Sequence, residues 1–255
     1  MTMMSELETL KAHALALKLH GLLNHWDELT PEQIPWLTHV LTWELSERKQ
    51  RSLERRLYSA KLGRFKPLTE FDWQWPTKID QQAIHRLMQL DFITDASNII
   101  FIGGNGVGKS TIAQNLGYQA VMQGHTVLFT SAANMLNDLA AQDGDNALRR
   151  RLTHYSRAKL LIIDEVGYLS YSNRHADLLF EIINRRYEKN ATLITTNRPF
   201  SEWNEVFPNA ACVVSLIDRL VHHSEVSAIE GDSYRMKEAQ EQAMARANVK
   251  KGKTK

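Results

Sequence analysis

Hydrophobic positions divide the chain into two parts with different periodicities. Over the first 66 residues, apolar side chains recur at helical spacing, as in Leu7, Leu10, Ala14 and Leu17. From residue 81 onward, short continuous apolar runs alternate with amphipathic stretches, which is typical of parallel strands connected by helices. The pattern therefore predicts a small all-helical N-terminal module, followed by an α/β domain built on a parallel sheet.

Five short apolar runs are the predicted strands of that sheet. They cover residues 98–102, 125–130, 159–163, 191–196 and 225–229. Helical periodicity predicts the helices that precede and connect them, at residues 81–90, 111–121, 133–141, 147–157 and 176–189. Because crossovers between parallel strands are right-handed, we expect helices on both faces of the sheet.

The expected domains follow from these patterns. Residues 1–66 form the helical module, for contact with DNA or a partner, and residues 81–238 form the α/β domain. Residues 67–80 combine prolines, which oppose regular structure, with aromatic side chains, which favour burial, so we interpret them as a linker packed on the domain. Stacking of Trp73 and Trp75 on bases is the alternative. Residues 239–255 are expected to form a disordered basic tail.

The turn after residues 98–102 has the pattern of a phosphate-binding loop, Gly-x-x-x-x-Gly-Lys-Ser. Glycines let the backbone turn so that successive N–H groups point at phosphate oxygens, and the helix that follows adds its positive end. The lysine supplies charge for the β- and γ-phosphates, and the serine hydroxyl can bind Mg²⁺. A dinucleotide site is disfavoured, because the Gly-x-Gly-x-x-Gly spacing is absent. The residues expected to bind ATP are Gly103, Gly104, Asn105, Gly106, Val107, Gly108, Lys109, Ser110 and Thr111.

Two acidic residues extend the predicted nucleotide site. Asp164 and Glu165 directly follow the apolar run 159–163, and ligands of open parallel sheets lie beyond the carboxyl ends of the strands. We expect Asp164 to hold Mg²⁺ together with Ser110, and Glu165 to polarise the attacking water. An ordinary polar cap of a helix is the alternative for this pair.

Asn197 ends the predicted strand 191–196, which should lie beside the strand that leads into the phosphate-binding loop. A neutral amide at this place could hydrogen-bond the attacking water or the γ-phosphate, as at the sensor-1 position of AAA+ ATPases. The alternative is an asparagine that caps a turn before Arg198 and Pro199.

Composition narrows the class of protein. Hydrophobic residues make up 43% and charged residues 24% of 255 positions, which is normal for a globular protein. No apolar run approaches the ~20 residues that span a bilayer, and the N-terminus has no signal-peptide pattern. The single cysteine, Cys212, excludes a disulfide framework, so the cytoplasm is the expected compartment. The adjacent His222 and His223 have no matching ligand spacing and are interpreted as structural.

Basic residues are concentrated, although the net charge is only +2. Eight of them lie between residues 48 and 66 with a single acid, Glu54. Because one acid does not offset the charge of eight cations within the run, the run indicates a polyanionic partner. Helical spacing places Arg48, Arg51 and Arg55 on one face, although a solvated helix face is the alternative. The residues expected to contact duplex DNA, largely independently of sequence, are Arg48, Lys49, Arg51, Arg55, Arg56, Lys61, Arg64 and Lys66.

The order of these motifs resembles the IstB family, ATPase helper proteins of insertion-sequence transposition that are relatives of DnaC-type helicase loaders. The resemblance also rests on Phe71-Asp72-Trp73, Ile217-Asp218-Arg219-Leu220 and residues 229–235. It implies an AAA+ P-loop core with ATP and Mg²⁺ as cofactors, assembly into a homo-oligomer on duplex DNA, and a transposase as partner.

The resemblance also implies that the active site lies between subunits, with an arginine finger supplied by the neighbour. Arg219 is the first candidate for this finger, and Arg185, Arg186 and Arg198 are alternatives. Arg235 resembles a sensor arginine that acts within its own chain. Four functions remain open at this point: a DNA-assembled ATPase switch for a transposase, a helicase loader, a small-molecule kinase, and a scaffold that binds ATP without hydrolysing it.

Overall fold

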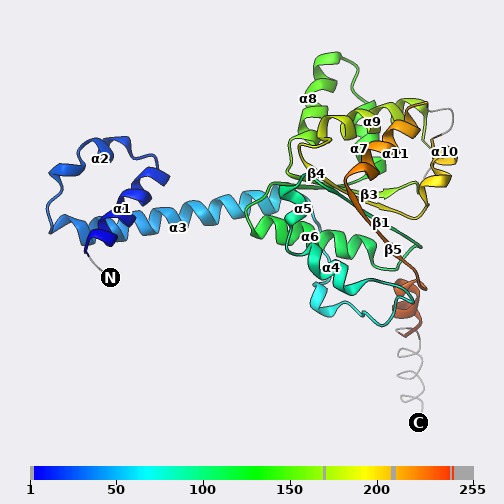
Figure 1. Ribbon diagram of the computed structural model, residues 1–255, viewed down its shortest axis with the longest axis horizontal. Coiled ribbons are helices and arrows are strands. Elements are labelled where there is room, and N and C mark those ends of the chain that lie inside the picture. The colour runs from blue at the N-terminus through cyan, green and yellow to red at the C-terminus, as the bar shows by residue number, and fades with distance from the viewer. Residues whose placement is uncertain (1–2, 169–170, 208–210, 242, 244–255) are drawn as a thin grey trace, which may run out of the picture. The chain divides into compact units, whose positions relative to one another are not determined.

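Five parallel strands form the central sheet of the computed structural model (Figure 1). They are β1 (Asn98–Gly103), β2 (Val127–Ser131), β3 (Leu160–Val166), β4 (Ala191–Thr196) and β5 (Ser224–Ile229). Their spatial order is β2-β3-β4-β1-β5, and all neighbours pair in parallel. The predicted α/β class and parallel sheet are confirmed, and β4 lies beside β1 as expected.

The structure describes residues 3–168, 171–207, 211–241 and 243, with side chains from residue 7 onward. The chain divides into two units, residues 1–55 and 56–255. Of the predicted basic tail, residues 242 and 244–255 lie outside the described part. Among the described residues, no helix has both the length and the apolar character needed to cross a membrane.

Helices cover both faces of the sheet in the second unit. On one side lie α7 (Ala132–Ala140), α8 (Asp145–Ser156), α9 (Asn173–Arg186) and α11 (Cys212–His222); on the other lie α4 (Gln81–Leu87) and α6 (Lys109–Met122) (Figure 1). The short helices α5 (Asp91–Thr94) and α10 (Trp203–Val206) connect them to the strands. Met135, Leu179 and Leu216 of the first side are fully buried. Each such side chain stabilises the fold by roughly 1.5–3 kcal/mol.

The first unit is helical, as predicted. Its described residues form α1 (Met3–Ala16), α2 (His20–Asn24), a 3₁₀ turn at Trp26–Glu28 and most of α3 (Gln33–Ala60). Its core consists of the side chains that recur at helical spacing: Leu10, Ala14, Leu17, Leu37 and Leu41.

The two units meet within α3, between Arg55 and Arg56, whereas the sequence predicts a boundary at residue 66. The difference arises because the residues after Arg55 pack with the second unit. Ala60 and Leu62 are buried, and the Gln114 side chain of α6 donates a 2.7 Å hydrogen bond to the carbonyl of Leu62. The end of a helix that reads as part of the N-terminal module thus belongs to the sheet-containing unit.

Residues 67–80 lie along the segment that follows β5. Lys78 and Glu230 exchange two backbone hydrogen bonds of 3.2 and 3.0 Å. The Trp75 indole donates to the carbonyl of Asp232 at 2.8 Å. Asp72 forms an ion pair of 3.1 Å with Lys237, whose ammonium lies 4.3 Å from the Trp75 ring centre. The aromatic linker is therefore held against residues 230–237, and its only regular structure among the described residues is one 3₁₀ turn at Leu68–Glu70.

Candidate active site

The phosphate-binding loop lies between β1 and α6, at the carboxyl end of the sheet. Gly106 and Gly108 have φ angles of 79° and 100°, which residues other than glycine rarely adopt. Both also face close neighbours, because a Cβ at Gly106 would collide with Ser233 and a Cβ at Gly108 with the ring of Phe71. These two glycines are needed both for the backbone conformation and for the approach of the segments around the loop.

Lys109, the first residue of α6, is 8% exposed and lies within the loop. Its Nζ donates hydrogen bonds of 2.8 and 2.7 Å to the carbonyls of Gly103 and Gly104. Burial lowers the pKa of this lysine, against the opposite effect of Asp164 and Glu165. A phosphate in the loop would supply the negative charge that a buried ammonium requires.

Asp164 lies near the carboxyl end of β3 and is 8% exposed. Its Oδ1 accepts hydrogen bonds from the hydroxyls of Ser110, at 2.8 Å, and Thr195, at 2.5 Å. The structure thus brings together the two residues predicted to hold Mg²⁺. A carboxylate beside a hydroxyl is the oxygen donor set that Mg²⁺ prefers, so the residues fit this ion.

Thr195 is a residue whose role the sequence analysis missed. Besides donating to Asp164, its hydroxyl accepts a 2.9 Å hydrogen bond from the backbone N–H of Glu165. The pairing of β3 with β4 is irregular between Ile163 and Val166, and Glu165 has a φ of 60°. A hydroxyl bonded to both acidic residues fixes this irregular segment, so that Asp164 stays buried while Glu165 is exposed on the cavity.

Asn197 directly follows β4, which pairs with β1 up to the contact of Thr196 with Ile102. The residue lines the same cavity as the loop. Its Oδ1 is buried and has no hydrogen-bond partner among the described residues. Such an acceptor costs about 1–3 kcal/mol when left unsatisfied, which is the arrangement expected of a group that bonds to a ligand or water.

A cavity of about 570 Å³ extends from the phosphate-binding loop to the linker. Four aromatic side chains line it, Phe65, Phe71, Trp75 and Tyr234, and this composition suits a purine ring. The segment after β5 also reaches the loop, since the backbone N–H of Tyr234 donates to the carbonyl of Gly106 at 3.0 Å. Arg235, the predicted sensor arginine, lines the cavity and contributes to lowering the Lys109 pKa.

The comparison with known protein families decides what kind of nucleotide site this is. The model of the family described as "IstB-like ATP binding protein" matches residues 5–242. The chain belongs to this family. The ATP-binding protein of insertion sequence IS21 from Pseudomonas aeruginosa is 36% identical over 243 residues, covering 95% of this chain and 92% of the relative. That of IS232 from Bacillus thuringiensis subsp. berliner is 33% identical, covering 92% and 94%.

Solved structures share the fold of this IstB-like protein at low sequence identity. The crystal structure of DnaI has a TM-score of 0.56 at 16% identity and covers 66% of this chain and 93% of DnaI. The replication initiator DnaA bound to AMPPCP and single-stranded DNA has a TM-score of 0.54 at 20% identity, covering 70% and 54%. The second unit is therefore an AAA+ P-loop core, and an all-helical module precedes it.

The candidates for the arginine finger differ in their surroundings. Arg186 is 1% exposed, and its guanidinium donates hydrogen bonds to several backbone carbonyls, among them those of Ser156 and Ala158 at 2.8 Å. Burial lowers its pKa to about 9. Because all of its donors point into its own chain, the structure removes Arg186 from the candidates. Arg185 and Arg198 form ion pairs with neighbouring glutamates.

Arg219 lies on α11 and is not among the residues that line the cavity. Its guanidinium stacks 4.6 Å from the ring centre of Phe180. Nη1 is buried without a hydrogen-bond partner among the described residues. The role of Arg219 as an arginine finger stays a prediction.

The predicted DNA-contacting residues do not form one uniform set. Arg48, Lys49, Arg51 and Arg55 are exposed on the part of α3 in the first unit. Arg48 and Arg51 form 2.7 Å ion pairs with Glu44 and Glu47, one helical turn earlier. The expectation that the basic run lacks internal compensation was therefore wrong, because it counted acids only within residues 48–66.

The remaining four lie in the second unit. Arg56 is half-buried and donates to the carbonyl of Val121 at 3.4 Å, whereas Lys61 is exposed. Arg64 and Lys66 line the nucleotide cavity, and Lys66 forms an ion pair with Glu238. The positions of Arg64 and Lys66 favour contact with the nucleotide over contact with DNA.

Proposed function

We propose that this protein is an Mg²⁺-dependent ATPase of an insertion sequence that assembles on duplex DNA as a homo-oligomer and assists a transposase. The observation that carries the enzymatic part is the hydrogen-bonded set of Ser110, Asp164, Thr195 and Glu165 beside the phosphate-binding loop. The insertion-sequence context comes from the relatives, which are ATP-binding proteins of such elements.

In this proposal each residue of the site has a distinct task. Lys109 and the backbone N–H groups of the loop bind the β- and γ-phosphates. Ser110 and Asp164 would hold Mg²⁺, which neutralises phosphate charge when bound. Glu165, exposed on the cavity, orients the attacking water and accepts its proton. Oδ1 of Asn197, which has no hydrogen-bond partner in the described part of the chain, accepts a hydrogen bond from that same water.

Two arginines complete the proposed machinery. Arg235 binds the γ-phosphate from within the same chain, since it lines the cavity. Arg219 reaches the γ-phosphate of a neighbouring subunit, where a positive charge stabilises the transition state. Hydrolysis would then require an assembled oligomer, and ATP turnover would control how long the assembly persists.

DNA contact is proposed for the exposed basic residues of α3, which carry charge without a base-reading element. Arginine and lysine on a helix surface neutralise phosphates of any sequence and release counterions. The complex with chromosomal DNA would place the protein in the cytoplasm. It would also make the target choice of the transposase depend on where this protein assembles.

The first experiment measures equilibrium binding to duplex and single-stranded DNA of equal length, with and without ATP and Mg²⁺, over a salt series. The proposal expects ATP-dependent duplex binding that is indifferent to sequence and weakens steeply with salt. Preference for single strands would instead favour the helicase-loader function. Absence of DNA binding in every state would reduce the conclusion to an AAA+ ATPase that acts on another protein.

A second experiment distinguishes the switch from a scaffold that binds ATP without hydrolysing it. Glu165→Gln keeps the size of the side chain but removes the base, so hydrolysis should be lost while ATP binding and assembly persist. Long-lived assemblies of Glu165→Gln on DNA, compared with transient ones of the wild type, would support the switch. Equal lifetimes for the two proteins would contradict it.

A further inference from the structure

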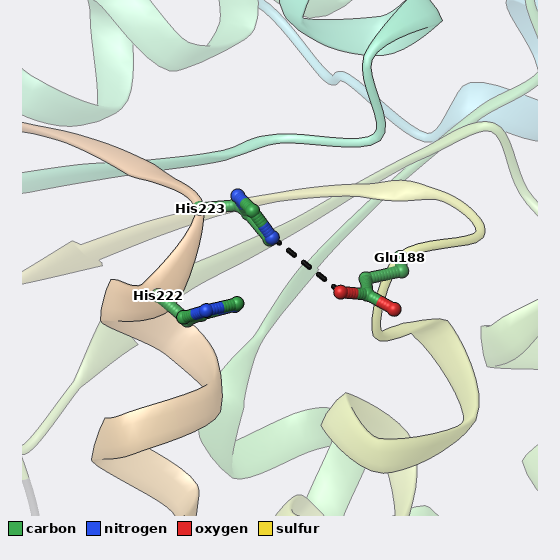
Figure 2. Close-up of side chains that lie close together, drawn as sticks. All are labelled: Glu188, His222 and His223. Atoms are coloured by element: carbon green, nitrogen blue, oxygen red, sulfur yellow. Dashed lines mark ion pairs between the residues drawn. The ribbon is translucent and has the colours of Figure 1, made fainter.

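The ends of α9 and α11 bring together a second group of chemically active side chains. Glu188 lies two residues after α9, His222 is the last residue of α11 and His223 follows it (Figure 2). All three are exposed. The sequence spacing offers no third ligand near the histidine pair, and the fold supplies one, Glu188, from the turn after α9.

This group lies away from the nucleotide site. The carbonyl of His223 accepts a 2.7 Å hydrogen bond from the backbone N–H of Asn98, the first residue of β1. The phosphate-binding loop follows the last residue of the same strand, Gly103. The histidine pair therefore lies at the amino ends of the strands, and the nucleotide cavity lies at their carboxyl ends.

The distances within the group suit a metal ion. One ligand atom from each of Glu188, His222 and His223 can be chosen so that all lie within 4.8 Å of one another. His223 Nε2 and Glu188 Oε1 are 3.4 Å apart. Two ligands held about 2.1 Å from a tetrahedral ion are separated by about 3.4 Å, so this pair already has the required spacing. Small rotations of exposed side chains bring the third ligand in.

We propose that Glu188, His222 and His223 form a binding site for one divalent transition-metal ion of the Zn²⁺ class. Two imidazole nitrogens and a carboxylate oxygen form a donor set that binds ions of the Zn²⁺ class in preference to Mg²⁺, which favours oxygen donors alone. Three protein ligands leave the fourth tetrahedral position for water or for a group from another molecule.

Tyr187 gives this site the outer hydrogen bond that metal-binding histidines use. Its hydroxyl lies 2.8 Å from Nδ1 of His222. When Nδ1 donates its proton to the Tyr187 oxygen, Nε2 carries the lone pair that binds a metal. The tyrosine thereby sets both the tautomer and the direction of the ring, and it acts as a positioning residue.

The test uses the full chain without an affinity tag, free of nucleotide, titrated with Zn²⁺ by calorimetry and with Co²⁺ by visible absorption. The inference predicts one ion per chain and tetrahedral Co²⁺ bands that Zn²⁺ abolishes. His222→Ala and Glu188→Gln should each weaken Zn²⁺ binding at least tenfold. Tyr187→Phe should weaken it about tenfold, as loss of an outer hydrogen bond does.

His39→Ala is the matched control, since His39 is exposed on α3 in the other unit. Zn²⁺ binding should be unchanged in this variant. Circular dichroism of Glu188→Gln should match the wild type, because the substitution keeps the size of an exposed side chain. Binding that persists undiminished in Glu188→Gln and His222→Ala would overturn the inference, and so would a wild-type Kd weaker than about 1 mM.

Discussion

Two regions of this protein are expected to bind phosphate, and they are built in different ways. At the carboxyl edge of the sheet, Lys109 and Asp164 are buried and held by hydrogen bonds to the loop, to Ser110 and to Thr195. On the part of α3 in the first unit, Arg48 and Arg51 are exposed and form ion pairs with glutamates one turn away. The first region is preorganised for one ligand geometry, whereas the second provides charge that adapts to any backbone.

This contrast makes different predictions for single substitutions. A preorganised site loses most of its function when one member is removed, because the remaining groups are buried without their partner. A distributed basic surface loses one phosphate contact per substitution and stays functional. The variants below are ordered from the largest to the smallest expected effect.

Lys109→Ala should have the largest effect. It removes the buried ammonium that is proposed to contact phosphate, and the expected loss of ATP affinity is on the order of 100-fold. Fluorescence titration with a labelled ATP analogue measures it. Lys159→Ala is the control, since Lys159 is exposed directly before β3. ATP affinity within threefold of the wild type in Lys109→Ala would contradict the proposed site.

Gly108→Ala tests whether the linker shapes the loop. Gly108 and Gly124 have similar positive φ values, 100° and 96°, but only Gly108 has a neighbour, Phe71, in the path of an added Cβ. Both variants should lower the melting temperature through backbone strain. Only Gly108→Ala should also weaken ATP binding, by about tenfold or more, since the loop and Phe71 must separate. Equal ATP affinity in the two variants would mean that displacing Phe71 does not affect ATP binding, which would contradict a role of the linker in shaping the loop.

Thr195→Val should slow hydrolysis while leaving ATP binding nearly unchanged. The valine removes the hydroxyl that joins the Asp164 carboxylate to the Glu165 backbone, which should cost about 1–2 kcal/mol, or about tenfold in kcat. Steady-state ATPase kinetics on DNA-bound protein measure kcat and KM separately. Thr195→Ser, which restores the hydroxyl, should recover most of the rate. A merely structural role would lower the melting temperature without this recovery.

Substitutions on α3 should have the smallest effects, and of both signs. Arg51→Ala should reduce the salt slope of DNA binding by about one and weaken affinity a few-fold. Glu47→Ala releases Arg51 from its ion pair and should strengthen binding slightly. Filter binding over a salt series measures both. The same sign for the two variants would exclude Arg51 as a phosphate contact.

Much of the active site could be predicted because its residues follow one another in short motifs. The strand before the phosphate-binding loop and the strand before Asp164 are apolar runs, and the rule that ligands bind at carboxyl ends of parallel strands then brings the motifs together. Asn197 lines the same cavity as the loop because the strand it follows, β4, pairs with β1. Helix α11 was missed, although Val213, Leu216 and Leu220 recur at helical spacing and are buried.

The unpredicted features depend on packing between segments far apart in the sequence. Thr195 is one of two adjacent threonines, and only the irregular pairing of β3 with β4 selects its hydroxyl for Asp164 and Glu165. In the sequence, Arg64 and Lys66 continue the basic run that begins at Arg48, whereas in the structure they line the nucleotide cavity. The buried Arg186 looks like any helical arginine until the carbonyls around it are known.

The contact between Tyr234 and Gly106 has a consequence for how the protein is made. The loop, Lys109 and Asp164 are all translated before residues 230–237, which supply Tyr234 and Arg235 to the cavity and hold the aromatic linker in place. A nascent chain that still lacks this segment has a sheet and a loop but no closed cavity. Tight ATP binding therefore requires that residues 230–237 have been translated, so a product terminated before them would not compete for nucleotide with a chain that contains them.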